Sequence, residues 1–239
     1  MSSLLAMNQV SASYGPFRAL YGVDLAIEEG QAMGLLGQNG AGKSTIARVI
    51  SGLVPVETGS IVIDGEKARR WSPEKARRQG VLHIPEGRGV FSSLSVEENL
   101  KVSLLAQPRT KRKALLGEVY ERFEMLGERR RARAGTLSGG QQRLLSLAPA
   151  FVAPPRLLIA DEPSLGLAPN VLDEIYASLA ALKAQGVTLL VSEQQVTRVL
   201  ELVDVAAVVD RGRIVHVGPP DEALGVLEAG LSQRGRSVG

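Results

Sequence analysis

The chain of 239 residues contains no cysteine, which excludes disulfides, zinc–thiolate centres and thiol catalysis. Aromatic residues make up only 4% of it, and its basic runs lack the interleaved aromatic side chains on which single-stranded nucleic acid stacks. No run approaches the roughly 18 uninterrupted apolar residues of a membrane span. The N-terminus has neither the basic start nor the apolar core of a signal peptide. We therefore expect no nucleic-acid partner, and work at a membrane through another protein; contact of the basic runs at 109–113 and 128–133 with anionic lipid headgroups stays open.

The order of apolar runs predicts an α/β fold. Short β-type runs fill residues 4–63, and similar runs recur at 81–85, 156–160 and 187–192. Between 88 and 150 the composition shifts to Leu, Ala, Arg, Glu and Lys with helical spacing. Continuous apolar strands that alternate with helices indicate a mostly parallel sheet covered on both faces. We expect a single domain over 1–239, with an α/β core at 1–87 and 151–239 and a helical subdomain at 88–150.

A glycine-rich loop carries the first chemical signal. GQNGAGKS at 37–44 fits the pattern G-x-x-x-x-G-K-[ST], after an apolar run and before a helix. Such glycines let backbone N–H groups surround phosphate oxygens at a helix N-terminus. The pattern predicts ATP or GTP binding, with Lys43 on the β- and γ-phosphates and Ser44 on Mg²⁺. The predicted nucleotide-binding residues of this segment are Gly37, Gln38, Asn39, Gly40, Ala41, Gly42, Lys43, Ser44 and Thr45.

Two adjacent carboxylates end the apolar run LLIADE. A buried strand that ends in aspartate is how enzymes with a glycine phosphate loop hold Mg²⁺, so Asp161 is a predicted metal ligand. Glu162, the next residue, is placed to orient or deprotonate the attacking water. We therefore predict that Glu162 is catalytic, together with Lys43.

The segment LSGGQQ at 137–142 points to a family. Ser138, Gly139, Gly140 and Gln141 form a second phosphate-recognising turn, for which one chain has no use unless it closes against another. With this segment the chain resembles the ATP-binding cassette (ABC) ATPases over essentially its whole length. The resemblance implies a P-loop NTPase (RecA-like) core, a helical signature subdomain and a small antiparallel β part. It also implies a head-to-tail dimer, in which these four residues cover the γ-phosphate of an ATP bound by the Lys43 of the other subunit.

Other positions match or depart from that family pattern. Tyr14 matches the aromatic residue that stacks on adenine, and 164–169 matches the loop that crosses to the partner. Glu86 stands where a glutamine usually senses the γ-phosphate, and we list it as a metal-site candidate. Gln194 replaces the usual switch histidine, and we predict that it is catalytic, donating to the γ-phosphate. An amide does not titrate near neutrality, so we expect no histidine-like limb in the pH–rate profile from this position.

These departures resemble one branch of the family. IPEGRGVF (84–91) and SEQQ (192–195) are similar to the second ATPase subunit of branched-chain amino-acid importers. That resemblance implies a peripheral subunit on the cytoplasmic face of the inner membrane, bound to transmembrane permease subunits and a second ATPase subunit, and served indirectly by a solute-binding protein. A sister ATPase is the expected dimer partner, and self-pairing stays open. The same ATPase on a urea or short-amide importer, or on a lipid or polysaccharide exporter, also stays open. A soluble ABC ATPase acting on ribosomes or DNA is disfavoured, because the chain has neither two cassettes nor a long coiled-coil insert.

Some residues stand outside these roles. Pro149 lies inside the helix that follows the signature, where proline costs about 3 kcal/mol unless the helix bends or ends.

We expect Arg88, Val90 and Phe91 to contact the permease. His83 and His216 are lone histidines without metal-ligand spacing, and we expect both to be structural.

Overall fold

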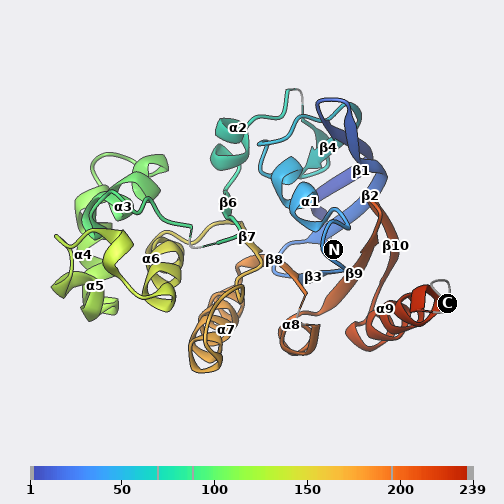
Figure 1. Cartoon of the computed structure of the whole chain (residues 1–239). Helices are drawn as coiled ribbons and strands as arrows, with labels where there is room; N and C mark the ends of the chain where they lie inside the picture. Colours follow the sequence, from blue (N-terminus) through green and yellow to red (C-terminus); the bar gives the residue numbers. More distant parts are fainter. Residues whose placement is uncertain (1–2, 69, 88, 195, 236–239) are drawn as a thin grey trace.

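The computed structural model describes residues 3–68, 70–87, 89–194 and 196–235 (Figure 1). Within them lie a four-stranded sheet in the order β2-β1-β4-β5 and a six-stranded sheet in the order β10-β9-β3-β8-β7-β6. The strands are β1 (Ser3–Tyr14), β2 (Phe17–Glu28), β3 (Ala32–Leu36), β4 (Thr58–Ile63), β5 (Glu66–Lys67), β6 (Val81–Ile84), β7 (Leu157–Asp161), β8 (Thr188–Glu193), β9 (Val205–Asp210) and β10 (Arg213–Gly218).

The larger sheet is mostly parallel, as predicted. β3 pairs in parallel with β8 and β9, and β7 pairs in parallel with β6 and β8, while β10 pairs antiparallel with β9. All residues of β3, β7 and β8 are buried, because helices or the smaller sheet cover both faces. In the smaller sheet the observed pairs are antiparallel.

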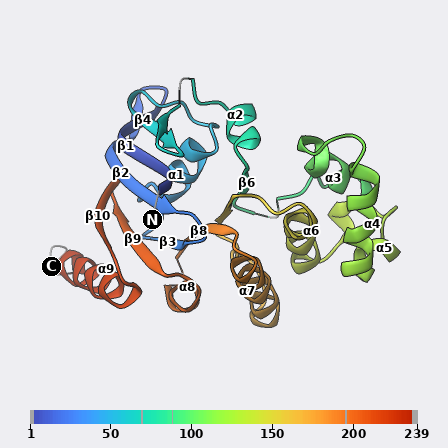
Figure 2. The same cartoon turned by 180° about the vertical axis from the view of Figure 1, so that it is seen from behind.

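The helices divide into those that cover the sheets and those that form the helical segment. They are α1 (Lys43–Ile50), α2 (Pro73–Arg78), α3 (Val96–Ser103), α4 (Arg112–Arg122), α5 (Glu124–Glu128), α6 (Gly139–Val152), α7 (Pro169–Ala184), α8 (Val196–Leu202) and α9 (Pro220–Gly235), with short 3₁₀ turns η1 (Leu104–Ala106) and η2 (Ala134–Thr136). Figures 1 and 2 show α3 to α6 set to one side of the sheets. No helix within the described part of the chain is long and apolar enough to cross a membrane.

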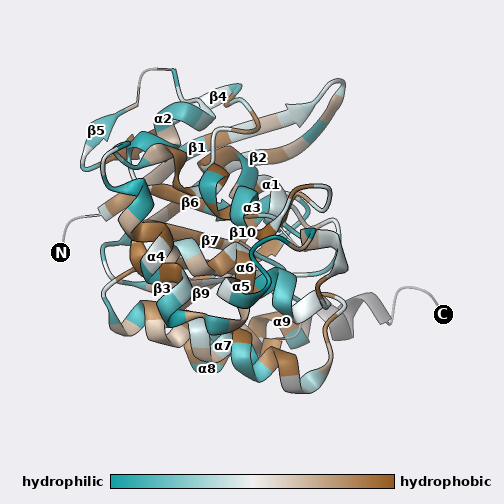
Figure 3. Cartoon of the chain, turned by 90° about the vertical axis from the view of Figure 1, so that its left-hand side faces the viewer, coloured by the Kyte–Doolittle hydropathy of each residue, from teal (hydrophilic) through white to brown (hydrophobic). Residues whose placement is uncertain are grey.

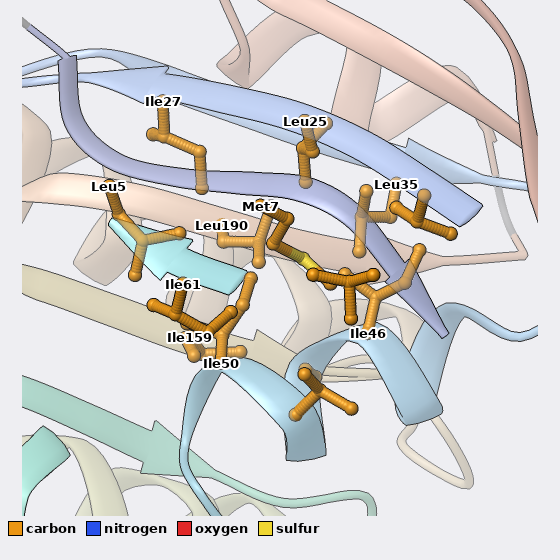
Figure 4. Packing of buried hydrophobic residues seen from close by; sticks show 14 of the residues in the cluster. Leu5, Met7, Leu25, Ile27, Leu35, Ile46, Ile50, Ile61, Ile159 and Leu190 are labelled. Carbon is orange, nitrogen blue, oxygen red and sulfur yellow. The ribbon is translucent and has the colours of Figure 1, made fainter. Parts of the chain in front are cut away.

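Three hydrophobic clusters hold these parts together. The first lies between the two sheets around α1, where Ile46 and Ile50 pack among residues of β1, β2 and β4 and of the parallel strands (Figure 4). The second joins the opposite face of the parallel sheet to α6, α7, α8 and α9. The third lies among α3, α4, α5 and α6. Figure 3 shows hydrophobic residues concentrated along the interior strands. α6 contributes to both of the last two clusters, so it links the helical segment to the sheet.

Pro149 lies within α6, three residues before its last residue. Its ring nitrogen cannot donate to the Leu145 carbonyl, so one hydrogen bond of the helix is missing. The helix continues for another three residues, and the Ala153 N–H then donates to the Pro149 carbonyl. The proline therefore stands in the last turn, where an interrupted hydrogen-bond ladder disturbs few residues.

Candidate active site

The glycine loop begins where β3 ends and leads into α1. Gly37 has φ 154°, and a Cβ added there would lie 2.4 Å from the Val209 carbonyl oxygen. Gly42 caps α1 with φ 114°, a backbone conformation that other residues rarely adopt. The predicted loop thus requires glycine at both ends, for space at the first and for backbone conformation at the second.

Lys43, the first residue of α1, is buried at the base of this loop. Its Nζ donates to the carbonyl oxygens of Gly37 (2.8 Å) and Gln38 (3.2 Å). The same nitrogen lies 3.7 Å from Oε1 of Glu162. A buried ammonium held by carbonyl dipoles and one carboxylate provides a fixed positive charge where phosphate oxygens are expected.

Asp161, the last residue of β7, faces Ser44 across the site. The Ser44 hydroxyl donates to Asp161 Oδ1 at 3.0 Å. Asp161 Oδ2 is buried and has no hydrogen-bond partner among the described residues. A carboxylate that binds a serine hydroxyl through one oxygen and has its other oxygen without a partner fits Mg²⁺, which is bound through few protein oxygens and keeps several waters. These two residues therefore fit a magnesium ion.

Glu162 follows at the strand end with φ 45°, in the left-handed region that a non-glycine residue adopts at a cost. Its backbone N–H donates to the Ser192 carbonyl at 3.0 Å. Both carboxylate oxygens accept hydrogen bonds from Gln194 Nε2, at 3.1 and 3.0 Å. The Gln194 amide, which we predict to donate to the γ-phosphate, thus hydrogen-bonds to Glu162 in this structure. It fixes the orientation of the Glu162 carboxylate.

A cleft of about 600 Å³ is lined by Lys43, Ser44, Glu162 and Gln194, whereas Asp161 lies behind Ser44 and is not among its lining residues. Tyr14 is not among the side chains that line it; it is 41% exposed, and its hydroxyl accepts a hydrogen bond from Arg48 at 3.3 Å. Its predicted stacking on adenine stays a prediction. The cleft is lined by Arg18, Ala19, Tyr21, Asn39, Gly40, Gly42, Lys43, Ser44, Thr45, Glu86, Glu162, Leu165, Gln194, Arg211 and Gly212.

The signature residues lie elsewhere, at the N-terminus of α6. The Gln141 N–H donates to the Ser138 hydroxyl (3.2 Å), and the Ser138 N–H donates to Gln141 Oε1 (3.0 Å), which is a capping box. A Cβ on Gly140 would lie 2.4 Å from Val171 Cγ1, so this position has no room for a side chain. None of the four signature residues lines the cleft. Within one chain, the structure does not bring them to the glycine loop.

Arg143 was missed by sequence reasoning, although it directly follows the signature. It is buried, and its guanidinium donates to the carbonyls of Pro85 (3.2 Å) and Glu162 (3.1 Å). Burial lowers the pKa of Arg143 to about 10. Through these hydrogen bonds Arg143 connects α6 to the segment before Glu86 and to the end of β7. An arginine on the apolar side of a helix is the signal that could have revealed it.

Comparisons with known proteins show the family to which the chain belongs. A model of the ABC transporter family matches residues 20–165. The chain belongs to the ABC transporter family. The high-affinity branched-chain amino acid transport ATP-binding protein BraG of Pseudomonas aeruginosa is 39% identical over 89% of this chain and 91% of its own. The probable branched-chain amino acid transport ATP-binding protein LivF of Archaeoglobus fulgidus is 31% identical over 92% of this chain and 94% of its own.

Solved structures agree with the fold. A nucleotide-free ATP-binding cassette of an ABC transporter has a TM-score of 0.81 at 24% identity and covers 95% of both chains. The ADP conformation of MJ1267, an ATP-binding cassette, has a TM-score of 0.80 at 25% identity and covers 95% of this chain and 96% of that one. The predicted family and ABC ATPase fold are confirmed. The chain is an ABC ATPase, and it binds and hydrolyses ATP.

Proposed function

We propose that this chain is the energy-coupling ATPase of an importer for branched-chain or other hydrophobic amino acids, held at the cytoplasmic face of the membrane by permease subunits. The proposed catalytic role is supported by one observation. The side chains that converge at one end of the parallel sheet are Lys43, Ser44, Asp161, Glu162 and Gln194. The cargo is proposed from the similarity to BraG and LivF alone, because the ATPase itself does not contact what is transported and its own residues separate the alternative cargoes poorly.

Glu162 is the proposed general base. Its carboxylate is oriented by Gln194 and lies beside Lys43, so it can accept a proton from water while the lysine holds the γ-phosphate oxygens. Ser44 and Asp161 would hold Mg²⁺, which neutralises the developing charge on the β- and γ-oxygens when bound. Glu86 lines the same cleft and is exposed, and we keep it as a candidate outer ligand of that ion.

A second ATPase subunit completes the site in this proposal. Ser138 to Gln141 lie outside the cleft of their own chain, and Leu165, in the loop after Glu162, is 48% exposed beside that cleft. A head-to-tail pair would bring the signature of one chain to the Lys43 of the other and would cover Leu165. A sister ATPase is the proposed partner.

Hydrolysis is tested by comparing Mg²⁺-ATP turnover of the wild-type chain with that of Glu162→Gln. We expect a loss of about 10²–10⁴-fold, because a general base contributes that much, with nucleotide affinity retained. Glu174→Gln, an exposed change on α7, is the matched control. Equal turnover in wild type and Glu162→Gln would refute the assigned base.

Cargo is tested in the host cell by deleting this chain and measuring uptake of radiolabelled leucine and urea. Loss of leucine uptake alone supports the proposal. Loss of urea uptake alone would assign the urea and amide alternative.

The permease contact is proposed for the segment after Glu86. Phe91 is 58% exposed, although its backbone is held on both sides by the buried Asn99, which accepts from the Phe91 N–H (2.7 Å) and donates to its carbonyl (3.0 Å). An exposed aromatic side chain on a fixed backbone suits a docking contact. Val90 packs against the third hydrophobic cluster, which lies among α3, α4, α5 and α6, so its substitution would also disturb the fold. Arg88 lies outside the described residues.

Phe91→Ala is therefore the informative change, and it should abolish co-purification with the permease while ATP binding is retained. Phe17→Ala removes an even more exposed phenylalanine, from the antiparallel sheet, and should leave the complex intact. Undiminished co-purification of Phe91→Ala would rule out this docking surface.

A further inference from the structure

Ser192 contacts both Asp161 and Glu162, and neither the sequence motifs nor the comparisons assign it a role. It is the fifth of six residues in β8, and the register of the parallel sheet pairs it with Asp161 on β7. Side chains of paired residues in adjacent strands project from the same face. The serine is 1% exposed, so its hydroxyl must find its partners inside the protein.

The Asp161 carboxylate is bound asymmetrically. Oδ1 accepts hydrogen bonds from the hydroxyls of both Ser44 and Ser192. Oδ2 is buried and accepts none from the described residues. Two donors on one oxygen fix the rotation of the carboxylate and leave its other oxygen available.

Ser192 also contacts the next residue. The Glu162 N–H lies 3.0 Å from the Ser192 carbonyl oxygen and 3.3 Å from its hydroxyl oxygen. The hydroxyl therefore donates to Asp161 while it accepts from the backbone of Glu162. One side chain thus fixes the orientation of the predicted metal ligand and contacts the strained backbone of the predicted base.

The two serines differ in what else they can do. Ser44 belongs to the glycine loop and lines the nucleotide cleft, whereas Ser192 is not among the residues lining that cleft. If Ser44 directs its oxygen to a cation, Ser192 is the remaining hydroxyl on Asp161 Oδ1. A buried carboxylate that lost both donors could rotate, and Mg²⁺ tolerates little departure from octahedral geometry.

We propose that Ser192 is a positioning residue: it holds the Asp161 carboxylate in one orientation, so that Oδ2, which has no partner among the described residues, is left for a divalent cation that Ser44 also binds. This inference rests on the proposed Mg²⁺-dependent hydrolysis. Groups that hydrogen-bond a metal ligand commonly contribute about 10–100-fold to metal affinity. The effect of losing Ser192 should therefore appear in cation binding and be absent from nucleotide binding without the cation.

The test measures Mn²⁺ binding to the full chain in the presence of a non-hydrolysable ATP analogue, by electron paramagnetic resonance of free Mn²⁺. Analogue affinity in EDTA is measured in parallel by calorimetry. Ser192→Ala is compared with Ser192→Thr, which keeps the hydroxyl. The matched control is Thr188→Val, because Thr188 is a buried hydroxyl of the same strand that accepts from the distant Gly30 N–H at 2.9 Å.

We expect the Mn²⁺ dissociation constant of Ser192→Ala to rise about tenfold, with unchanged analogue affinity in EDTA. Ser192→Thr and Thr188→Val should match wild type. An unchanged Mn²⁺ constant in Ser192→Ala, an equal loss in Thr188→Val, or no rescue by threonine would each overturn the inference. Absence of analogue-dependent Mn²⁺ binding in the wild type would instead count against the proposed magnesium site itself.

Discussion

Glu162 shows how the active site is set at the scale of single residues. Its backbone is left-handed, its carboxylate accepts from Gln194, and Lys43 lies 3.7 Å away. Strain of this kind persists only where surrounding contacts hold it, and it is common at functional sites. Gln194 supplies such contacts to the side chain, so it should matter to turnover even if it never touches phosphate.

Gln194→Ala should lower kcat about 10–100-fold, because a hydrogen bond to a charged group is worth about 1.5–3 kcal/mol. Gln194→His should introduce a pH dependence near pH 6.5 that the wild-type residue cannot supply. Steady-state kinetics from pH 5.5 to 8.5 measures both. Gln185→Ala, at the exposed end of α7, serves as control. A Gln194→His chain with wild-type rates at every pH would show that the side chain is idle.

His83 provides a separate residue-scale prediction, on stability. The Ser51 hydroxyl donates to the Ala47 carbonyl at 2.6 Å, so His83 Nδ1 must donate to the Ser51 oxygen, 2.8 Å away. The other ring nitrogen is buried without a partner among the described residues. Burial lowers the pKa of His83, because the charged ring is poorly solvated there. The ring therefore stays neutral in the folded chain at pH values where the unfolded chain binds a proton.

Since the unfolded state binds the extra proton, the free energy of unfolding should fall as the pH drops below about 6.5, the ordinary histidine pKa. The loss should stop once the pH passes the lower pKa of the folded state. Urea unfolding between pH 8 and 5 measures this. His83→Asn should lack this component, whereas His216→Asn, at the only other histidine, should keep it. Identical pH profiles for wild type and His83→Asn would contradict the assignment.

The motifs were readable from sequence because phosphate and metal chemistry restricts the residue types at fixed spacing. Lys43, Ser44, Asp161 and Glu162 could therefore be named in advance. The contact between Gln194 and Glu162 could not, because it depends on the register of β7 against β8, which residue spacing does not reveal. Ser192 and Arg143 carry no motif of their own, so only the packed structure shows what they touch.

At the scale of elements, α6 connects the signature to the sheet. It begins with the capping box at Ser138 and Gln141, carries Arg143 to the carbonyl of Glu162, and ends just beyond Pro149. Its helical character was predictable from composition. The two clusters that it joins were not, because each depends on contacts between segments distant in sequence.

Pro149→Ala should stabilise the chain by roughly 1–2 kcal/mol. Restoring the helix hydrogen bond and removing the clash of the ring with the preceding turn together gain about 3 kcal/mol, while loss of two buried ring methylenes costs about 1.5 kcal/mol. The urea midpoint measures the difference. A lower midpoint for Pro149→Ala would show that packing of the ring outweighs the missing hydrogen bond.

At the scale of the whole molecule, the two turns predicted to recognise phosphate are separate. Lys43 and Ser44 line the cleft, whereas Ser138 to Gln141 begin a helix that does not reach it. The predicted α/β class, mostly parallel sheet and helical segment all correspond to the observed fold (Figure 1). The division into 1–87 with 151–239 and 88–150 stays a proposal, although α3 to α6 fall between 96 and 152. In the proposed function both turns act on one nucleotide, and this separation is why the proposal requires a second subunit.

The most direct test of that requirement is the mass of Glu162→Gln by light scattering, with and without Mg²⁺-ATP, alone and mixed with its sister ATPase. We predict a monomer without ATP and a dimer with ATP in at least one of the two samples, because hydrolysis no longer opens the closed pair. A second change, Ser138→Arg, should prevent the dimer by obstructing the signature turn. A chain that binds ATP but remains monomeric in both samples would contradict the account.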